Sequence, residues 1–321
     1  MRAFICSRDD VVTRLEWEDG SAEARPVLEG VPVRCVAADG DRVIIGTQGA
    51  GALLSSDGGR RWGRMELPEP DVFSVAIGPA DGALYAGTEP SRLFVLRDGA
   101  KWTELEALQD IPSRDRWSFP PRPWTHHVRT IALHPSDPGW LAVGIELGGV
   151  MRSLDGGASW IDHNPQAHSD AHQLLTHPLA PDRLYEAAGQ GIARSEDRGE
   201  TWSRFESGLD RHYAWAQAID PADPDLWYVA ISRSPFAAHG EGDGQARLLR
   251  SRGNAWEAID TWGDGPALRR MPYALATLPA QPEHLLVGLR GGSLLLTADA
   301  GQSWSRLRVE LPDLIDLAVA A

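Results

Sequence analysis

The sequence predicts an all-β fold, a seven-bladed β-propeller of four-stranded antiparallel blades that takes up residues 1–321 as a single domain. Three observations lead to this prediction. A motif of eight residues returns along the whole chain, the tryptophans that mark its copies stand 40 to 58 residues apart, and short apolar stretches fill the distance between them. One four-stranded blade takes about 40 to 50 residues, so seven tryptophan marks predict seven blades.

The motif reads Ser or Thr, any residue, Asp, any residue, Gly, any residue, Ser or Thr, Trp. Three copies are complete, a fourth lacks only the hydroxyl before its tryptophan, and three further tryptophans mark worn or uncertain copies. In chain order the marks are Trp17, Trp62, Trp102, Trp160, Trp202, Trp256 and Trp304. The four good copies carry Asp57, Asp155, Asp197 and Asp299.

These aspartates are predicted to be structural. Asp, Ser and Thr side chains bind nearby backbone amides in tight turns, and glycine accepts the positive φ that such turns need. The tryptophan then supplies apolar surface that fixes the turn against its neighbour. Catalysis by the four carboxylates is disfavoured, because equivalent positions spread around a ring cannot share one site.

The motif resembles the Asp box of the BNR-repeat β-propellers, a superfamily that includes sialidases, sortilin-type receptors, photosystem II assembly factors and many bacterial proteins. The resemblance covers nearly the whole chain and implies the propeller fold. It implies no single function, because the Asp box occurs across all of these activities.

Each blade is expected to start with an apolar innermost strand, followed by a turn, a strand that ends in glycine, a third strand, the box and a last strand. The innermost strands are expected to start at Val33, Val72, Val128, Ala171, Ala214 and Ala274. Residues 1–20 and 311–321 are expected to pair into one closing blade, since a propeller hides its edge strands. By length, this blade is predicted to be a strand short.

Composition excludes several classes of function. The net charge of −14 argues against nucleic-acid binding, which needs a basic surface, and against binding to an acidic membrane. The N-terminus has no secretory pattern and no apolar run reaches about 20 residues, so a cytoplasmic location without membrane spans is expected. Cys6 and Cys35 are expected to be small core residues rather than a disulfide.

Strand direction divides the polar residues between two faces of the propeller. The loops between second and third strands and the links between blades emerge on one face, and most of the histidines lie there. Two long segments, about 103–127 and 233–246, emerge on the same face, and long loops in compact domains are often functional. We expect them to cover a central pocket as a lid.

A metal site is the sharpest hypothesis for this face. Its predicted ligands come from consecutive blades: His127, Glu146, His172 and His212, with His126 and His168 as alternates. Imidazoles with one carboxylate suit Zn²⁺, Fe²⁺ or Mn²⁺ and could activate water. The simpler interpretation is that these histidines bind the loop backbone, since no local metal motif supports them. A metal-free alternative makes His172, beside Asp170, a general base.

The other candidates surround this cluster. Glu146 and His172 are the expected acid–base groups, and Tyr213 and Tyr273 are expected donors to a developing oxyanion. The predicted contacts to an anionic small molecule are Arg233, Arg269, Arg270, Arg290, Gln190 and Trp124. No nucleotide cofactor is expected.

Three functions remain open from the sequence. The first is a hub pocket for a small anionic ligand, with metal-assisted hydrolase or lyase chemistry. The second is a propeller without catalysis that binds a protein partner through exposed arginines or tryptophans. The third, a glycoside hydrolase of the sialidase kind, would be expected to show an Arg-x-Pro motif before the first blade, which this sequence lacks.

Overall fold

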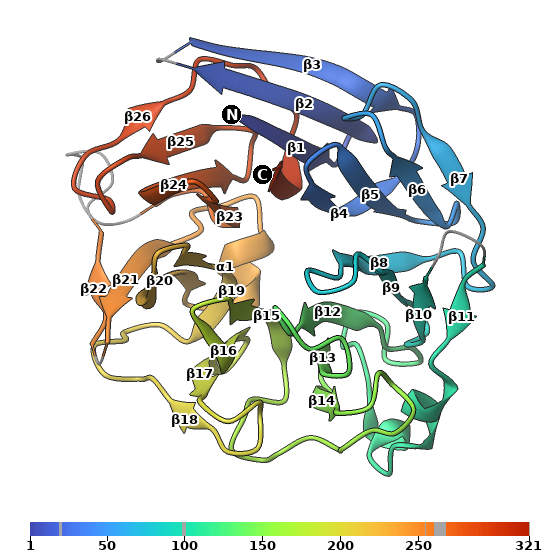
Figure 1. Ribbon diagram of the computed structural model, residues 1–321. Coiled ribbons are helices and arrows are strands. Elements are labelled where there is room, and N and C mark those ends of the chain that lie inside the picture. The colour runs from blue at the N-terminus through green and yellow to red at the C-terminus, as the bar shows by residue number, and fades with distance from the viewer. Residues whose placement is uncertain (19–20, 98–100, 254, 260–267, 321) are drawn as a thin grey trace.

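The computed structural model describes residues 1–18, 21–97, 101–253, 255–259 and 268–320. In these residues, seven antiparallel sheets stand around a common hub as the blades of a propeller (Figure 1). The predicted fold class is confirmed. We number the blades 1 to 6 along the chain from Val33 and call the closing sheet blade 7.

Blades 1 to 3 follow one another from the first innermost strand, which is given first for each. Blade 1 consists of β4 (Val33–Asp39), β5 (Arg42–Thr47), β6 (Ala52–Ser55) and β7 (Gly63–Met65). Blade 2 consists of β8 (Val72–Ile77), β9 (Leu84–Thr88), β10 (Leu93–Leu96) and β11 (Thr103–Glu104). Blade 3 consists of β12 (Val128–Leu133), β13 (Leu141–Ile145) and β14 (Gly149–Ser153), and its outer edge has only the bridge between Arg152 and Ile161.

Blades 4 to 6 continue in the same order. Blade 4 consists of β15 (Ala171–His177), β16 (Ala180–Ala188), β17 (Gly191–Ser195) and β18 (Ser203–Arg204). Blade 5 consists of β19 (Tyr213–Asp220), β20 (Asp223–Ser232), β21 (Arg247–Arg252) and β22 (Glu257–Ala258). Blade 6 consists of β23 (Pro272–Leu278), β24 (Gln281–Leu289), β25 (Leu294–Thr297) and β26 (Ser305–Arg306).

Blade 7 joins the two ends of the chain. Its strands, from the hub outwards, are β27 (Leu314–Ala320), β1 (Arg2–Ser7), β2 (Val11–Glu18) and β3 (Ser21–Glu29). The pairing of β27 with β1 confirms the predicted closure. The expectation that this blade lacks a strand is wrong, because β3 supplies the fourth strand beyond the predicted limit at residue 20.

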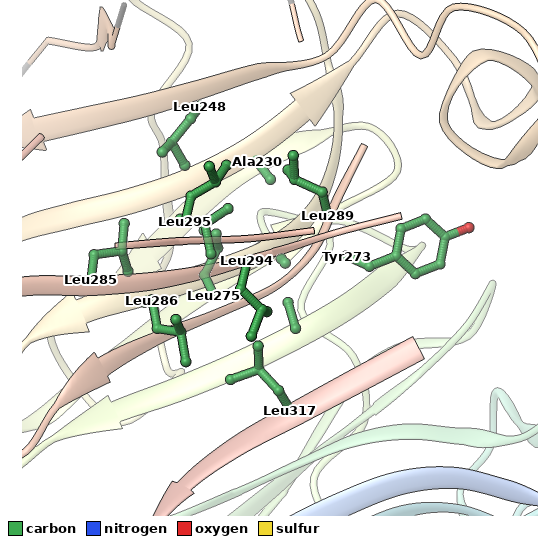
Figure 2. Close-up of a cluster of buried hydrophobic side chains, with 14 of the residues drawn as sticks. Ala230, Leu248, Tyr273, Leu275, Leu285, Leu286, Leu289, Leu294, Leu295 and Leu317 are labelled. Carbon is green, nitrogen blue, oxygen red and sulfur yellow. The ribbon is translucent and has the colours of Figure 1, made fainter. Parts of the chain in front are cut away.

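The core lies between neighbouring blades. Each cluster of buried side chains joins adjacent sheets, and the largest connects blades 5, 6 and 7. Figure 2 shows leucines of β24, β25 and β27 in this cluster, with the hydroxyl of Tyr273 pointing away from them. Burying apolar surface between sheets gives each blade much of its stability through its two neighbours.

Small residues let the blades approach closely near the hub. An added Cβ at Gly87 of β9 would stand 2.6 Å from Cβ of Val128 in the next blade, and one at Gly144 of β13 would stand 2.9 Å from Cβ of Ala171. These distances are too short for any larger residue. The strand-ending glycines in the sequence therefore mark the contact of each second strand with the following blade.

The two long segments hold short helices. The first contains the 3₁₀ turns η1 (Glu106–Asp110) and η2 (Arg114–Arg116), and the second contains the helix α1 (Pro235–His239), which lies near the hub (Figure 1). Among the residues that the structure describes, no helix has the length and apolar character that a membrane crossing needs.

Candidate functional site

Every innermost strand has a β-bulge at the same place, close to its first residue. Pairing with the second strand skips one residue in each blade, and that residue lies in the innermost strand. The seven skipped residues, which we call the hub ring, are Arg34, Phe73, Arg129, His172, Trp215, Tyr273 and Ile315. A bulge turns a side chain away from its regular direction, so this backbone feature sets the side chains of the ring.

Members of the hub ring contact one another. The guanidinium carbon of Arg34 lies 4.2 Å from the ring centre of Phe73, and that of Arg129 lies 4.5 Å from the ring centre of Trp215. The ring centres of His172 and Trp215 are 4.9 Å apart, and Tyr273 lies 5.5 Å from Trp215. The hub end of the propeller is therefore lined by stacked arginines and aromatic rings.

An acidic cluster lies beside this ring, where blades 3 and 4 meet. Glu146 follows the second strand of blade 3, Asp170 precedes β15, and His172 is the bulged residue of β15. One ligand atom from each of these three residues lies within 4.8 Å of the other two. They are positioned by equivalent places in consecutive blades, because the end of a second strand and the start of an innermost strand meet on one face.

The tautomer of His172 follows from its partners. Its Nδ1 atom lies 2.6 Å from the carbonyl oxygen of Ala214, which can only accept, so Nδ1 carries the proton. The Nε2 atom therefore presents a lone pair, and it lies 3.6 Å from Oδ1 of Asp170. The side chain is only 1 % exposed, which fixes this orientation.

Glu146 is held in its ionised form. Its Oε2 atom lies 3.0 Å from Nε2 of His127 and 3.7 Å from Nε of Arg129. Burial alone would raise the pKa of Glu146, but the hydrogen bond with His127 and the charges of His172 and Arg129 outweigh burial and lower it to about 2. At Asp170 burial prevails, and the charge of Glu146 acts with it, so the pKa of Asp170 is raised.

The helix α1 closes over this group from blade 5. Ser234 caps it by accepting a hydrogen bond from the amide of Ala237, and Pro235 occupies its first position. At its last residue, Nε2 of His239 lies 2.6 Å from the hydroxyl of Tyr213 and Nδ1 lies 2.5 Å from the hydroxyl of Tyr273. Burial and the charges of His172 and Arg129 lower the pKa of His239 to about 4, so it is neutral at pH 7.

Two predicted residues are thus joined by one that the sequence did not identify. Tyr213 and Tyr273 are buried, and burial raises the pKa of both phenols, so both remain protonated. A neutral imidazole has one donor and one acceptor, so one phenol donates to His239 and the other accepts from it. Their predicted role as oxyanion donors is untested.

The structure separates the predicted metal ligands. His127 is buried and contacts Glu146, and His172 lies in the acidic cluster, whereas the side chain of His212 is exposed and joins neither. The reason is register: His212 stands one residue before Tyr213, and it is Tyr213 that occupies the place equivalent to Asp170. The alternates also lie elsewhere, since His126 packs on Trp117 and His168 is buried with its amide bound to Glu186.

Most of the predicted ligand contacts lie at the surface. Arg290 is the exception, but its guanidinium is committed to the carbonyls of His239 and Gly240 at the end of α1 and to Glu241. The side chain of Trp124 is 79 % exposed. The other exposed candidates are Arg233, Arg269, Arg270 and Gln190. Arg129 of the hub ring is the arginine that the structure places beside the acidic cluster.

The four Asp-box aspartates have the predicted structural role. Asp155 accepts hydrogen bonds from the amide and hydroxyl of Ser159 and from the hydroxyl of Ser153, which lower its pKa to about 2. The corresponding bonds form at Asp197 and Asp299, and Asp57 accepts from the amides of Arg60 and Arg61. All four side chains are therefore engaged within their own turns.

Comparisons with known proteins identify the fold. No protein-family model and no curated protein matches this sequence. Among solved structures, the chain resembles the GH74 xyloglucanase from Xanthomonas campestris, with a TM-score of 0.65, 18 % identity and coverage of 86 % of this chain and 45 % of the enzyme. An ancestral GH74 enzyme is covered over 38 % of its length, so this chain spans less than half of either.

Two further structures match over most of both chains. YCF48 bound to D1 peptide has a TM-score of 0.58 at 16 % identity, with 86 % of this chain and 82 % of that chain covered. Virginiamycin B lyase from Staphylococcus aureus has a TM-score of 0.63 at 13 % identity, with coverage of 89 % and 87 %. At these identities the likeness establishes a shared propeller fold, which has hosted unrelated activities.

Proposed function

We propose that the hub binds a divalent transition metal on Glu146, Asp170 and His172, and beside it a small anionic molecule on which it performs hydrolase or lyase chemistry. The supporting observation is the convergence of three ligand atoms within 4.8 Å. Two carboxylates and one neutral imidazole suit Mn²⁺, Fe²⁺ or Zn²⁺.

The residues fit such an ion. Ligand atoms about 2.1 Å from a common ion are at most about 4.2 Å apart, so the three side chains need only a small closing movement. The hydrogen bond from Nδ1 of His172 to the carbonyl of Ala214 is the supporting contact that metal-bound histidines usually make. His127 gives the same kind of support to Glu146.

Side chains of this chain supply the remaining functions. A bound ion would polarise a substrate oxygen or lower the pKa of a water molecule. Arg129, stacked on Trp215 beside Glu146, offers a cation to an anionic substrate. Tyr213, whose raised pKa reflects burial and the charges of Glu146 and Asp170, stays protonated and can donate a hydrogen bond.

A metal-free base is the alternative for the same site. Nε2 of His172 has its lone pair free of the backbone and lies near Asp170, so it could accept a proton directly. The adjacent Arg129 favours this alternative, because its charge competes with a metal for Glu146.

A second candidate function is binding of a protein partner without catalysis. Two large apolar side chains lie exposed in the two long segments, Trp124 at 79 % and Phe236 of α1 at 88 %. Exposed aromatic residues are typical anchors of protein interfaces. The structure of YCF48 with a D1 peptide gives a propeller of this fold with a bound peptide. The glycosidase hypothesis has only the carboxylate pair Glu146 and Asp170 in its favour.

Metal binding tests the leading proposal. Protein purified without a histidine tag and treated with a chelator is titrated with Mn²⁺ and Zn²⁺ by calorimetry, and about one equivalent should bind. His172→Ala should weaken binding by about ten-fold or more, whereas His212→Ala, an exposed histidine of the next blade, should leave it unchanged. Binding of less than about a tenth of an equivalent, or equal losses in both variants, would contradict the proposal.

A further inference from the structure

Arg34 of the hub ring lacks the partner that similar arginines have. In the described part of the chain, eight arginines stack on an aromatic ring, and seven of these also form an ion pair with a carboxylate within 4.0 Å. Arg34 stacks on Phe73 but has neither an ion pair nor a hydrogen bond among the described residues, and its Nε atom is buried.

Such an arginine is unfavourable unless something binds it. A buried N–H group without an acceptor loses its hydration and gains nothing in return. Stacking on Phe73 occupies one face of the guanidinium and leaves its edge, with Nε and one terminal nitrogen, free in the plane. That edge matches the two oxygens of a carboxylate or phosphate.

A second arginine with the same feature lies nearby. Arg122 stacks on Phe119 and binds Glu89 through one terminal nitrogen, but its buried Nε atom has no partner. Phe119 and Phe73 both pack against the imidazole of His127, at 4.8 and 3.8 Å between ring centres. The two arginines therefore extend from aromatic rings that share one histidine.

We infer that Arg34 and Arg122 form an oxyanion-binding site for the carboxylate or phosphate group of the ligand. The site lies on the side of His127 away from Glu146, because Phe73 stacks on the imidazole whose Nε2 atom bonds to Glu146. This inference rests on the proposed function for the rest of the ligand, which would extend past His127 to the acidic cluster. It narrows the substrate class to molecules with an oxyanion at one end and a reacting group at the other.

Electrostatics supports the assignment. Burial lowers the pKa of Arg34, and the positive charge of Arg122 acts in the same direction against Asp71 and Glu89. A bound oxyanion would offset both effects.

Thermal unfolding of chelator-treated protein tests the site without a metal. Benzoate and inorganic phosphate, each up to about 50 mM at constant ionic strength, stand for the carboxylate and the phosphate. At least one should raise Tm in a saturable way, and the anion that does so identifies the class. Arg34→Met should weaken the fitted affinity by about ten-fold or more.

Arg116→Gln is the matched control, because Arg116 is exposed in the same segment as Arg122. It should keep the full rise in Tm. General salt effects act on all variants alike, so an equal rise in Arg34→Met, or no saturable rise in the wild type, would overturn the inference.

Two further measurements separate the alternatives. Without anions, Arg34→Met should be at least as stable as the wild type, since an unpaired buried charge is removed; a marked loss of stability would instead assign Arg34 a structural role. Arg34→Lys, which keeps the charge but not the planar edge, should also bind the anion more weakly. Metal affinity should be unchanged in Arg34→Met, so absence of metal binding with saturable anion binding would remove only the metal proposal.

Discussion

The Nε2 atom of His239 lies 2.6 Å from the hydroxyl of Tyr213, and this hydrogen bond ties the end of α1 to the innermost strand of its own blade. The opposite ring nitrogen reaches Tyr273 in blade 6. The helix is therefore fastened to two blades directly above the hub, and access to the acidic cluster depends on these contacts.

Removal of the imidazole should loosen α1. His239→Ala deletes two hydrogen bonds of about 1 kcal/mol each, so amide exchange at Ala238 and Gly240 should become about ten-fold faster or more. Hydrogen exchange detected by mass spectrometry or NMR measures this. Phe236→Ala, which removes a side chain that is 88 % exposed, should leave exchange unchanged. Equal protection in His239→Ala would show that α1 is held by other contacts.

Glu186 should make the protein less stable as pH rises. Burial raises its pKa to about 8, against about 4.3 in an unfolded chain. The folded state thus keeps a proton that the unfolded state releases, and the free energy of unfolding should fall between about pH 4.3 and 8, by up to about 1 kcal/mol per pH unit.

Glu186→Gln cannot ionise and should escape this fall. Its Tm should exceed that of the wild type by a margin that grows from pH 5 to pH 8, as measured by calorimetry. Glu206→Gln, at an exposed position beyond the same blade, should show a constant difference. A margin at Glu186 that does not depend on pH would mean that the carboxyl group does not titrate in this range.

Close approach of the blades should make Gly87 intolerant of a methyl group. A Cβ there would lie 2.5 Å from Oγ of Ser74 and 2.6 Å from Cβ of Val128, so Gly87→Ala should destabilise the fold by about 1–3 kcal/mol. Denaturant unfolding measures the loss. Gly63→Ala in the outer strand β7 meets nothing closer than 3.8 Å and should be neutral or slightly stabilising.

The Asp boxes should differ in strength according to one hydroxyl. Asp155 binds both the amide and the hydroxyl of Ser159, whereas the equivalent residue beside Asp57 is Arg61, which offers only its amide. Asp155→Ala should therefore lower Tm more than Asp57→Ala, and Ser159→Ala should reduce the difference. Neither aspartate variant should change metal binding. The opposite order would mean that the turns are held mainly by their tryptophans.

The fold could be predicted because its signals are local. Box turns and apolar strands repeat in each blade, and the innermost strands begin at Val33, Val72, Val128 and Ala171 as predicted. Strand β3 was missed because Ser21–Glu29 is largely exposed and follows no Asp box. Its apolar pattern is correspondingly weak.

The site could be predicted only in part. His127, His172 and Glu146 were placed near one another from strand direction alone, and this is confirmed. His212 was wrong because a difference of one residue turns a side chain to another face, and periodicity does not reveal where a strand begins to face the hub. The role of Asp170 as a cluster member was considered only through His172.

Three site residues had weaker signals. Arg129 and Trp215 occupy bulges, which have no sequence motif, although each stands between small or apolar residues at the same place in its strand. His239 reaches the hub because α1 folds back over it, a contact between distant parts of the chain. Such tertiary contacts are not encoded in any local pattern.

The seven bulges make the hub chemically editable. Because each presents one side chain from the same backbone geometry, outside the strand ladder, its identity can change without altering the pairing around it. Seven letters, combined independently, could give one scaffold a cationic, acidic or aromatic centre. Divergent specificities could thus arise in such propellers by single substitutions at these positions, while the blades that carry them stay the same.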